Sequence, residues 1–145
     1  MCLEAMDSDP INRIRSRVLV ESLEPLGDEL LAYFAERKIS EGTLRRNNVM
    51  QVADRKGTIA FAYKRNGLFV GCKYRTVDEK RFWQARNTEK VLYGLDDIVG
   101  ADAIVIVEGE IDKLSLEEAG YCNCVSVPAG APQTVSSKEL PPIDQ

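Results

Sequence analysis

The chain has 145 residues, of which 44% are hydrophobic and 29% charged, and its formal net charge is −4. This balance is typical of one ordinary globular domain or two small subdomains, and it excludes a coiled coil, a fibre or a low-complexity tail. Because the sequence contains no histidine, a His-ligated zinc and a Ser-His-Asp triad within this chain are excluded as well.

The N-terminal part of the sequence predicts a lead and a pair of helices. Residues 1–24 show no clear period, and we expect a weakly ordered lead or an edge element. Apolar residues recur at near-helical spacing from 27 to 38, which predicts an amphipathic helix. Ser40 is a good N-cap for a short second helix that ends near Arg46. The two helices are predicted to form a compact packing or docking element.

A β-hairpin is predicted after the helices. The dipeptide Asn66-Gly67 separates two alternating segments at 58–64 and 68–75, which is typical of a type I′ turn. A third segment at 81–85 is predicted to extend this antiparallel sheet. A period of two predicts that one face of the second strand carries Leu68, Val70, Cys72 and Tyr74, and the other face Phe69, Gly71, Lys73 and Arg75.

Residues 73–90 are locally basic, although the whole chain is acidic. Aromatic residues are interleaved with the cations, which suits single-stranded nucleic acid because cations meet phosphates while aromatic rings stack on unpaired bases. A solvated sheet face with cross-strand ion pairs would give a similar composition, and this alternative stays open. The candidate contacts to nucleic acid or nucleotide are Lys73, Arg75, Lys80, Arg81, Trp83 and Arg86.

A βαβ unit is predicted further along the chain. The four β-branched residues at 104–107 form a run that is short for a helix and too apolar for a half-exposed strand, so we expect a buried, central parallel strand. Gly109 permits a tight turn, a helix is predicted at 111–119, and a second strand at 124–127. This order of elements is that of a βαβ unit.

Three carboxylates, Glu108, Glu110 and Asp112, follow the predicted strand. The carboxyl ends of strands are where open α/β sheets bind ligands. Glu108 is placed there to ligate Mg²⁺, and an ion held by one or two carboxylates needs phosphates and water to complete its octahedron. Glu110 and Asp112 have an alternative explanation, since acidic residues in a first helical turn favourably oppose the helix dipole. The pattern therefore predicts a phosphate-bearing ligand.

Three further features of the sequence limit the kinds of protein to which this chain can belong. The four cysteines match neither a zinc knuckle nor a disulfide framework, so we expect free thiols, a reducing compartment and no zinc. No apolar run reaches the ~20 residues that cross a bilayer, and we expect no membrane partner. Residues 131–145 predict a loop or linker, and neither a P-loop nor a dinucleotide fingerprint occurs.

Several segments carry a family resemblance: Val107-Glu-Gly-Glu-Ile-Asp112, Tyr93-Gly-Leu95 before it and residues 125–131 after it. They resemble the Toprim domain of phage-type primase-helicases, and especially the plant organellar Twinkle-type proteins. The hairpin with residues 72–75 and the segment 82–84 look like the basic subdomain that precedes Toprim in those primases. The resemblance covers residues 25–142 or nearly so, and the joint order of the motifs is more specific than any one of them.

The resemblance implies an α/β fold in which an N-terminal α+β basic subdomain, with a helical pair and an antiparallel hairpin sheet, precedes the first βαβ unit of a Rossmann-like Toprim sheet. It implies synthesis of short RNA primers on single-stranded DNA from nucleoside triphosphates with Mg²⁺. Glu108 matches the Toprim glutamate, a metal ligand or acid-base group, while Glu110 and Asp112 match its acidic neighbours. Lys73 and Arg75 match cations near nucleotide or template. The implied organisation is a lead at 1–24, the basic subdomain at 25–100, a partial Toprim domain at 101–132 and a tail at 133–145.

The chain departs from the family in the second half of the metal site. After Pro132 it has no Asp-x-Asp, and the family's zinc-binding and helicase domains are missing, so we expect a truncated homologue with an incomplete Mg²⁺ site that is inactive alone. The alternative is a non-catalytic protein that binds single-stranded DNA or docks on a replication partner. An open sheet edge predicts self-association. The family implies a mitochondrial or chloroplast location, whereas the lack of a visible transit peptide leaves cytoplasm or nucleus open.

Overall fold

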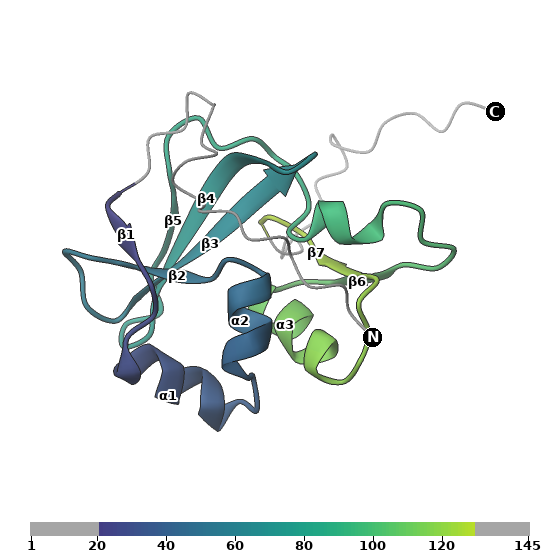
Figure 1. Ribbon diagram of the computed structural model, residues 1–145. Helices are drawn as coiled ribbons and strands as arrows, with labels where there is room; N and C mark the ends of the chain where they lie inside the picture. The colour runs from purple at the N-terminus through teal and green to yellow at the C-terminus, as the bar shows by residue number, and fades with distance from the viewer. Residues whose placement is uncertain (1–20, 130–145) are drawn as a thin grey trace, which may run out of the picture.

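An antiparallel sheet forms the larger part of the structure, a computed structural model that describes residues 21–129. Its five strands follow one another in sequence order and are β1 (Leu23–Glu24), β2 (Met50–Val52), β3 (Thr58–Arg65), β4 (Leu68–Thr76) and β5 (Phe82–Gln84). Figure 1 shows helices α1 and α2 together beside the N-terminal half of this sheet. The third strand of the sheet is thus confirmed, whereas most of the predicted lead at 1–24 and the whole tail at 133–145 fall outside the described residues.

The predicted helical pair is confirmed as α1 (Asp28–Glu36) and α2 (Glu41–Arg46). Leu30 and Phe34 of α1 pack in one core cluster with Phe61 of β3, so the apolar stripe of the helix covers the sheet. Ser40 caps α2, since its hydroxyl oxygen accepts a hydrogen bond from the Thr43 amide at 3.4 Å.

The hairpin turn between β3 and β4 has the predicted form. Asn66 has a φ of 52° and Gly67 a φ of 75°, as a type I′ turn requires. The carboxylate of Asp96, in the short 3-10 helix η2 (Leu95–Ile98), accepts hydrogen bonds from both turn amides, at 2.7 Å from Asn66 and 2.9 Å from Gly67. The turn is therefore tied to the segment that leads into the βαβ unit.

The predicted division of faces on β4 is wrong at Val70. Tyr63 pairs with Gly71 but Lys64 pairs with Phe69, so Val70 is an extra residue in the ladder. Val70 consequently packs in the cluster that contains Tyr63, whereas Cys72 and Tyr74 pack in a second cluster. One bulged residue reverses the alternation of side chains beyond it, and the sequence period carried no sign of it.

The predicted βαβ unit is confirmed as β6 (Val105–Val107), α3 (Glu110–Glu118) and β7 (Cys124–Ser126). Its strands are parallel, with Val105 opposite Cys124, and Tyr93 bridges to the other side of β7 at Ser126. None of the helices between residues 21 and 129 combines the length and apolar character that a bilayer crossing requires.

The expectation of a buried, central β6 is wrong for the described residues. Ile106 is 61% exposed, and β6 pairs with β7 alone, so within residues 21–129 it is an edge strand. A continuous apolar strand is buried only when elements cover both of its faces, and the described part of the chain packs α3 against one. Self-association through this edge stays a prediction.

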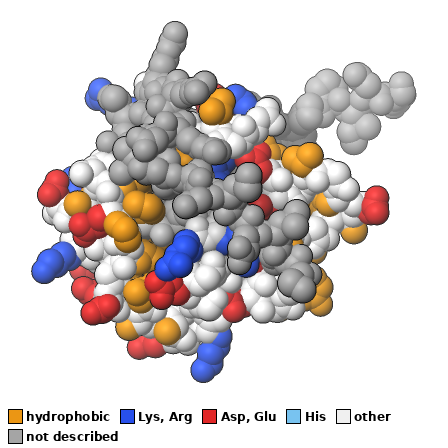
Figure 2. Space-filling model, viewed as in Figure 1, with side chains coloured by type: hydrophobic (Ala, Val, Ile, Leu, Met, Phe, Trp, Pro, Cys, Tyr) orange, Lys and Arg blue, Asp and Glu red, His pale blue; other side chains and the backbone are white. Residues whose placement is uncertain are grey.

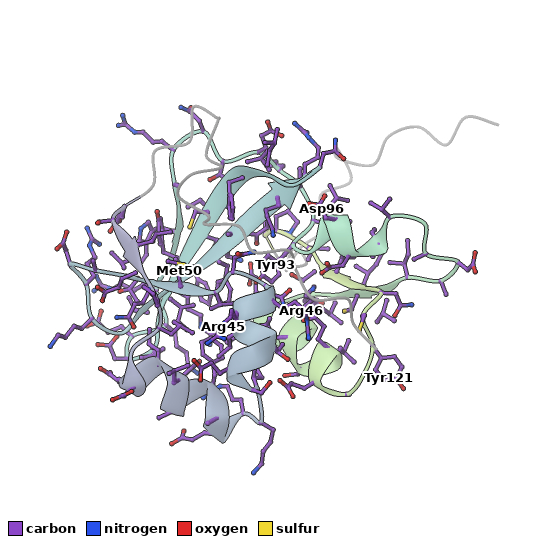
Figure 3. The ribbon with its side chains drawn as sticks, in the orientation of Figure 1. Arg45, Arg46, Met50, Tyr93, Asp96 and Tyr121 are labelled. Carbon is purple, nitrogen blue, oxygen red and sulfur yellow. The ribbon has the colours of Figure 1, made fainter. Side chains whose placement is uncertain are left out.

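A buried polar network joins the two parts of the fold. Lys113 on α3 is 0% exposed, and its Nζ donates to Asn47 Oδ1 at 2.8 Å, Asp97 Oδ2 at 2.5 Å and Glu117 Oε1 at 3.2 Å. Glu117 also accepts from Asn47 Nδ2 and, at 3.4 Å, from the Arg46 guanidinium. Figure 3 shows Arg46 where α2 faces α3. Charged groups thus hold the helical pair against the βαβ unit.

The prediction that the cysteines are free thiols is correct for some of them only. Cys72 and Cys124 are free and buried, and burial raises the pKa of the Cys72 thiol to about 12. Cys122, in contrast, is disulfide-bonded, so the expectation is wrong for this residue.

Candidate functional site

A pocket of about 490 Å³ lies between the β4–β5 edge of the antiparallel sheet and the turn from β6 into α3. The antiparallel sheet contributes its C-terminal strands and the βαβ unit contributes both of its strand ends, so the site needs both parts of the fold. Figure 2 shows acidic and basic side chains interspersed over the visible described surface, so the charges in the pocket matter through their local placement. The lining residues are Lys73, Arg75, Phe82, Trp83, Gln84, Glu108, Gly109, Glu110, Pro128 and Ala129.

Glu108 is the exposed carboxylate of the pocket. It leaves β6 and precedes Gly109, the N-cap of α3, so the end of the parallel strand positions it at the pocket wall. This is the place that the sequence predicted for it, at the carboxyl edge of the sheet. The exposed side chain is able to meet a ligand directly.

Glu110 is instead a buried carboxylate with protein partners. It is 5% exposed, and its Oε1 accepts hydrogen bonds from the Tyr63 hydroxyl and, at 2.8 Å, from Lys73 Nζ. Lys73 Nζ also donates to the Pro128 carbonyl at 3.1 Å. Burial, and then the Glu110 charge, raise the pKa of Tyr63 far above its usual value, so this hydroxyl stays a donor. The Lys73–Glu110 pair therefore fixes β4 to the start of α3.

Arg75 has no such carboxylate. Among residues 21–129 no ion pair involves its guanidinium, and its buried Nε has no hydrogen-bond partner. The guanidinium carbon lies 5.2 Å from the centroid of the Phe82 ring. A guanidinium presents a fork of donors that matches phosphate oxygens, so Arg75 is the cation of the pocket best placed to bind an anion.

The aromatic residue on the cationic face is Phe82 and not Trp83. In the β4–β5 ladder Phe82 is opposite Arg75, whereas Trp83 is opposite Tyr74 and its ring lies 5.3 Å from the Tyr74 ring between centroids. Trp83 still borders the pocket, but much of its ring serves in packing. Sequence reasoning chose Trp83 and missed Phe82, although the period of two on β5 was the signal that could have found it.

The remaining candidates lie outside the pocket. Asp112 is exposed on the first turn of α3, near Gly109, where the alternative explanation by the helix dipole applies. Arg81 is exposed and pairs with Glu79 at 2.7 Å. The structure thus brings together Lys73, Arg75, Trp83, Glu108 and Glu110, and it leaves Asp112, Lys80, Arg81 and Arg86 outside.

Whether these residues can hold a metal ion depends on a bound phosphate that supplies further oxygen ligands. The described stretch contains no group of three carboxylate, cysteine or histidine side chains that could hold an ion by themselves. Glu108 is one exposed carboxylate, which fits Mg²⁺ only where phosphate oxygens and water supply the other positions.

Comparison with curated proteins finds two plant relatives, and no family model matches the chain. A primase homolog protein of Arabidopsis thaliana is 56% identical over 139 residues, which is 94% of this chain and 41% of that protein. A Twinkle homolog protein of the same plant, named as chloroplastic/mitochondrial, is 54% identical over 142 residues, 95% of this chain and 20% of that protein. The chain therefore spans less than half the length of either relative.

Solved structures show the same fold. The catalytic core of DnaG matches with a TM-score of 0.58 at 16% identity, over 73% of this chain and 49% of that one. The DnaG primase catalytic domain bound to single-stranded DNA matches with a TM-score of 0.53 at 15% identity, over 74% and 50%. At such low identity these likenesses concern the fold, and they confirm the predicted mixed α/β class.

Proposed function

The chain is a primase homologue, as its resemblance predicted, and on that premise we propose that its pocket binds single-stranded DNA and a nucleoside triphosphate for the synthesis of RNA primers. The observation that carries the proposal is the pocket itself, in which Arg75 and Lys73 of the antiparallel sheet share a cavity with Glu108 of the βαβ unit. Cations and a carboxylate are the groups that phosphoryl transfer needs around a Mg²⁺-bound phosphate.

Each group has a distinct proposed role. Arg75, which pairs with no carboxylate in the described part of the chain, would hold a phosphate of the template or nucleotide. Lys73, fixed by Glu110 and Pro128, would contribute positive potential from one constant position. Glu108 would ligate Mg²⁺ together with the phosphates, and the bound ion would supply charge neutralisation during nucleotidyl transfer.

A second function deserves a test because Glu110 is committed to Lys73 and Tyr63 within the described residues. Among the described lining residues of the pocket, this leaves Glu108 as the one acidic side chain able to meet a ligand, so a non-catalytic binder of single-stranded DNA is the alternative. We also propose an organellar location, because the Twinkle relative is named as chloroplastic/mitochondrial. Docking on a replication protein is likewise proposed and needs its own binding assay.

Glu108→Gln is expected to lower primer yield at least about tenfold, because loss of the carboxylate charge weakens the metal contact that stabilises the transition state. The measurement is primer synthesis by the full chain on single-stranded DNA with Mg²⁺ and nucleoside triphosphates. Glu36→Gln, the same change on the exposed side of α1, is the matched control.

Equal yields from wild type and Glu108→Gln would remove Glu108 from the mechanism. If the wild-type chain binds single-stranded DNA and makes no primers, the non-catalytic function takes the place of the first proposal.

Arg75→Gln is expected to weaken binding of single-stranded DNA and to reduce the magnitude of the slope of log K against log salt by about 0.7. The variant makes one phosphate contact fewer, so its binding releases fewer counterions. A salt titration by fluorescence anisotropy measures both effects. Arg45→Gln is the control, since Arg45 is exposed on α2 and pairs with Glu41 at 3.0 Å, away from the pocket. An unchanged slope in Arg75→Gln together with a changed one in Arg45→Gln would place the DNA elsewhere.

A further inference from the structure

Phe82 is a large apolar side chain that lines the pocket and is exposed to solvent. It is 53% exposed although it lies in strand β5, where it is paired with Arg75 of β4. The other large apolar side chains that are exposed among the described residues lie outside the pocket, and they are Leu68, Val99, Ile104, Ile106 and Tyr121. Its combination of exposure and position therefore sets Phe82 apart.

Two cations flank the ring and leave much of it accessible. The Arg75 guanidinium carbon lies 5.2 Å and Lys73 Nζ 5.6 Å from the ring centroid. Both cations belong to the neighbouring strand β4, so they orient the ring from the sheet side through cation–π contacts. The ring is thus held in place by its neighbours without being covered by them.

The alternation on β5 separates this ring from the packing role of its neighbour. Trp83 faces Tyr74 and the second core cluster, and its Nε1 donates to Glu21 at 3.4 Å. Phe82 belongs to neither core cluster. Packing of the described residues therefore does not account for an aromatic residue at this position.

We propose that Phe82 stacks on an unpaired nucleobase whose attached phosphate binds Arg75. The inference rests on the proposed function and deepens it, because it assigns the base contact to one residue. Stacking needs an exposed, oriented ring, and the phosphate needs a nearby cation. The cross-strand pair supplies both, since Phe82 lies opposite Arg75, which pairs with no carboxylate between residues 21 and 129. Any base has a flat aromatic face, so the contact is tolerant of sequence.

The experiment compares Phe82→Leu with wild type for binding to a fluorescently labelled oligothymidylate and to an abasic oligomer with the same number of phosphates. Phe82→Leu should bind the oligothymidylate about 5- to 150-fold more weakly, which is the ~1–3 kcal/mol of one stacked base at 1.4 kcal/mol per decade. Its affinity for the abasic oligomer should equal that of wild type. Phe82→Trp should restore binding to the base-bearing strand.

Tyr121→Leu is the matched control, because Tyr121 is 54% exposed and lies outside the pocket, at the far end of the βαβ unit in Figure 3. Circular dichroism checks that each variant is folded. A parallel titration with a nucleoside triphosphate shows whether the stacked base belongs to the strand or to the nucleotide, and a Phe82-dependent loss with either ligand supports the proposal.

Equal affinity of Phe82→Leu and wild type for every base-bearing ligand would overturn the proposal, as would an equal loss on the abasic oligomer. The second result would make Phe82 a support of the phosphate site or a contact for another protein segment. Failure of wild type to bind single-stranded DNA and nucleotide would instead overturn the proposed function, so the two failures are distinguishable.

Discussion

Lys113→Met is expected to lower the free energy of unfolding by about 3–5 kcal/mol, because it leaves a buried carboxylate without its cation. The substitution keeps the length and most of the apolar stem of the side chain but removes the ammonium that Glu117, Asp97 and Asn47 share. Glu117 is then a buried carboxylate without that counter-charge, and among the described cations the Arg46 guanidinium at 3.4 Å alone still offsets its charge. Chemical denaturation followed by circular dichroism measures the loss.

Two further variants make this expectation specific. Lys56→Met, at an exposed lysine, should change the free energy of unfolding by no more than about 0.5 kcal/mol. Adding Glu117→Leu to Lys113→Met should recover part of the loss, because a buried ion pair replaced by apolar groups leaves no unpaired charge. If Lys113→Met is as stable as wild type, the network does not hold the two parts of the fold together.

Lys73→Met is expected to cost about 3 kcal/mol of stability, because it leaves the Glu110 carboxylate in the fold without its cation. The Tyr63 hydroxyl still donates to that carboxylate, which limits the loss. The double variant Lys73→Met/Glu110→Leu should be more stable than Lys73→Met alone, as a denaturation series shows.

The contrast with Arg75 is what makes the Lys73 experiment informative. Arg75→Gln should leave stability within about 0.5 kcal/mol of wild type while it weakens DNA binding, since no carboxylate between residues 21 and 129 pairs with Arg75. Lys73→Met should act first on stability. If Lys73→Met melts like wild type and loses DNA binding to the same degree as Arg75→Gln, Lys73 is a ligand contact and its pairing with Glu110 is incidental.

Local signals in the sequence predicted the elements well. Asn66-Gly67 predicted a turn with two positive φ angles, and both residues have them. Ser40 was predicted to cap the second helix, and its hydroxyl accepts a hydrogen bond from the Thr43 amide. The apolar strand, Gly109 and the helix after it gave the βαβ unit. Such features depend on residues within a few positions of one another, which is why one sequence suffices to find them.

Contacts between distant residues decided the rest of the site. The bulge at Val70 arises from the register of two strands, and the burial of Glu110 arises from Tyr63, 47 positions earlier. The sequence did not predict the burial of Lys113, because a lysine on a helix is usually exposed to solvent. The structure shows it to be buried, with partners at the C-terminal end of α2, on η2 and on α3 itself.

The sequence by itself determined the order of the elements, the similarity to the plant primase homolog and Twinkle homolog proteins, and the position of Glu108 at the end of a parallel strand. The tertiary structure alone decided which charges of the pocket are paired: among the described residues no ion pair involves Glu108 or Arg75, whereas Glu110 and Lys73 neutralise each other. The physical reason is that spacing along the chain fixes the direction of a side chain within its own element. The groups that it meets there come from other elements, and they determine whether its charge is compensated.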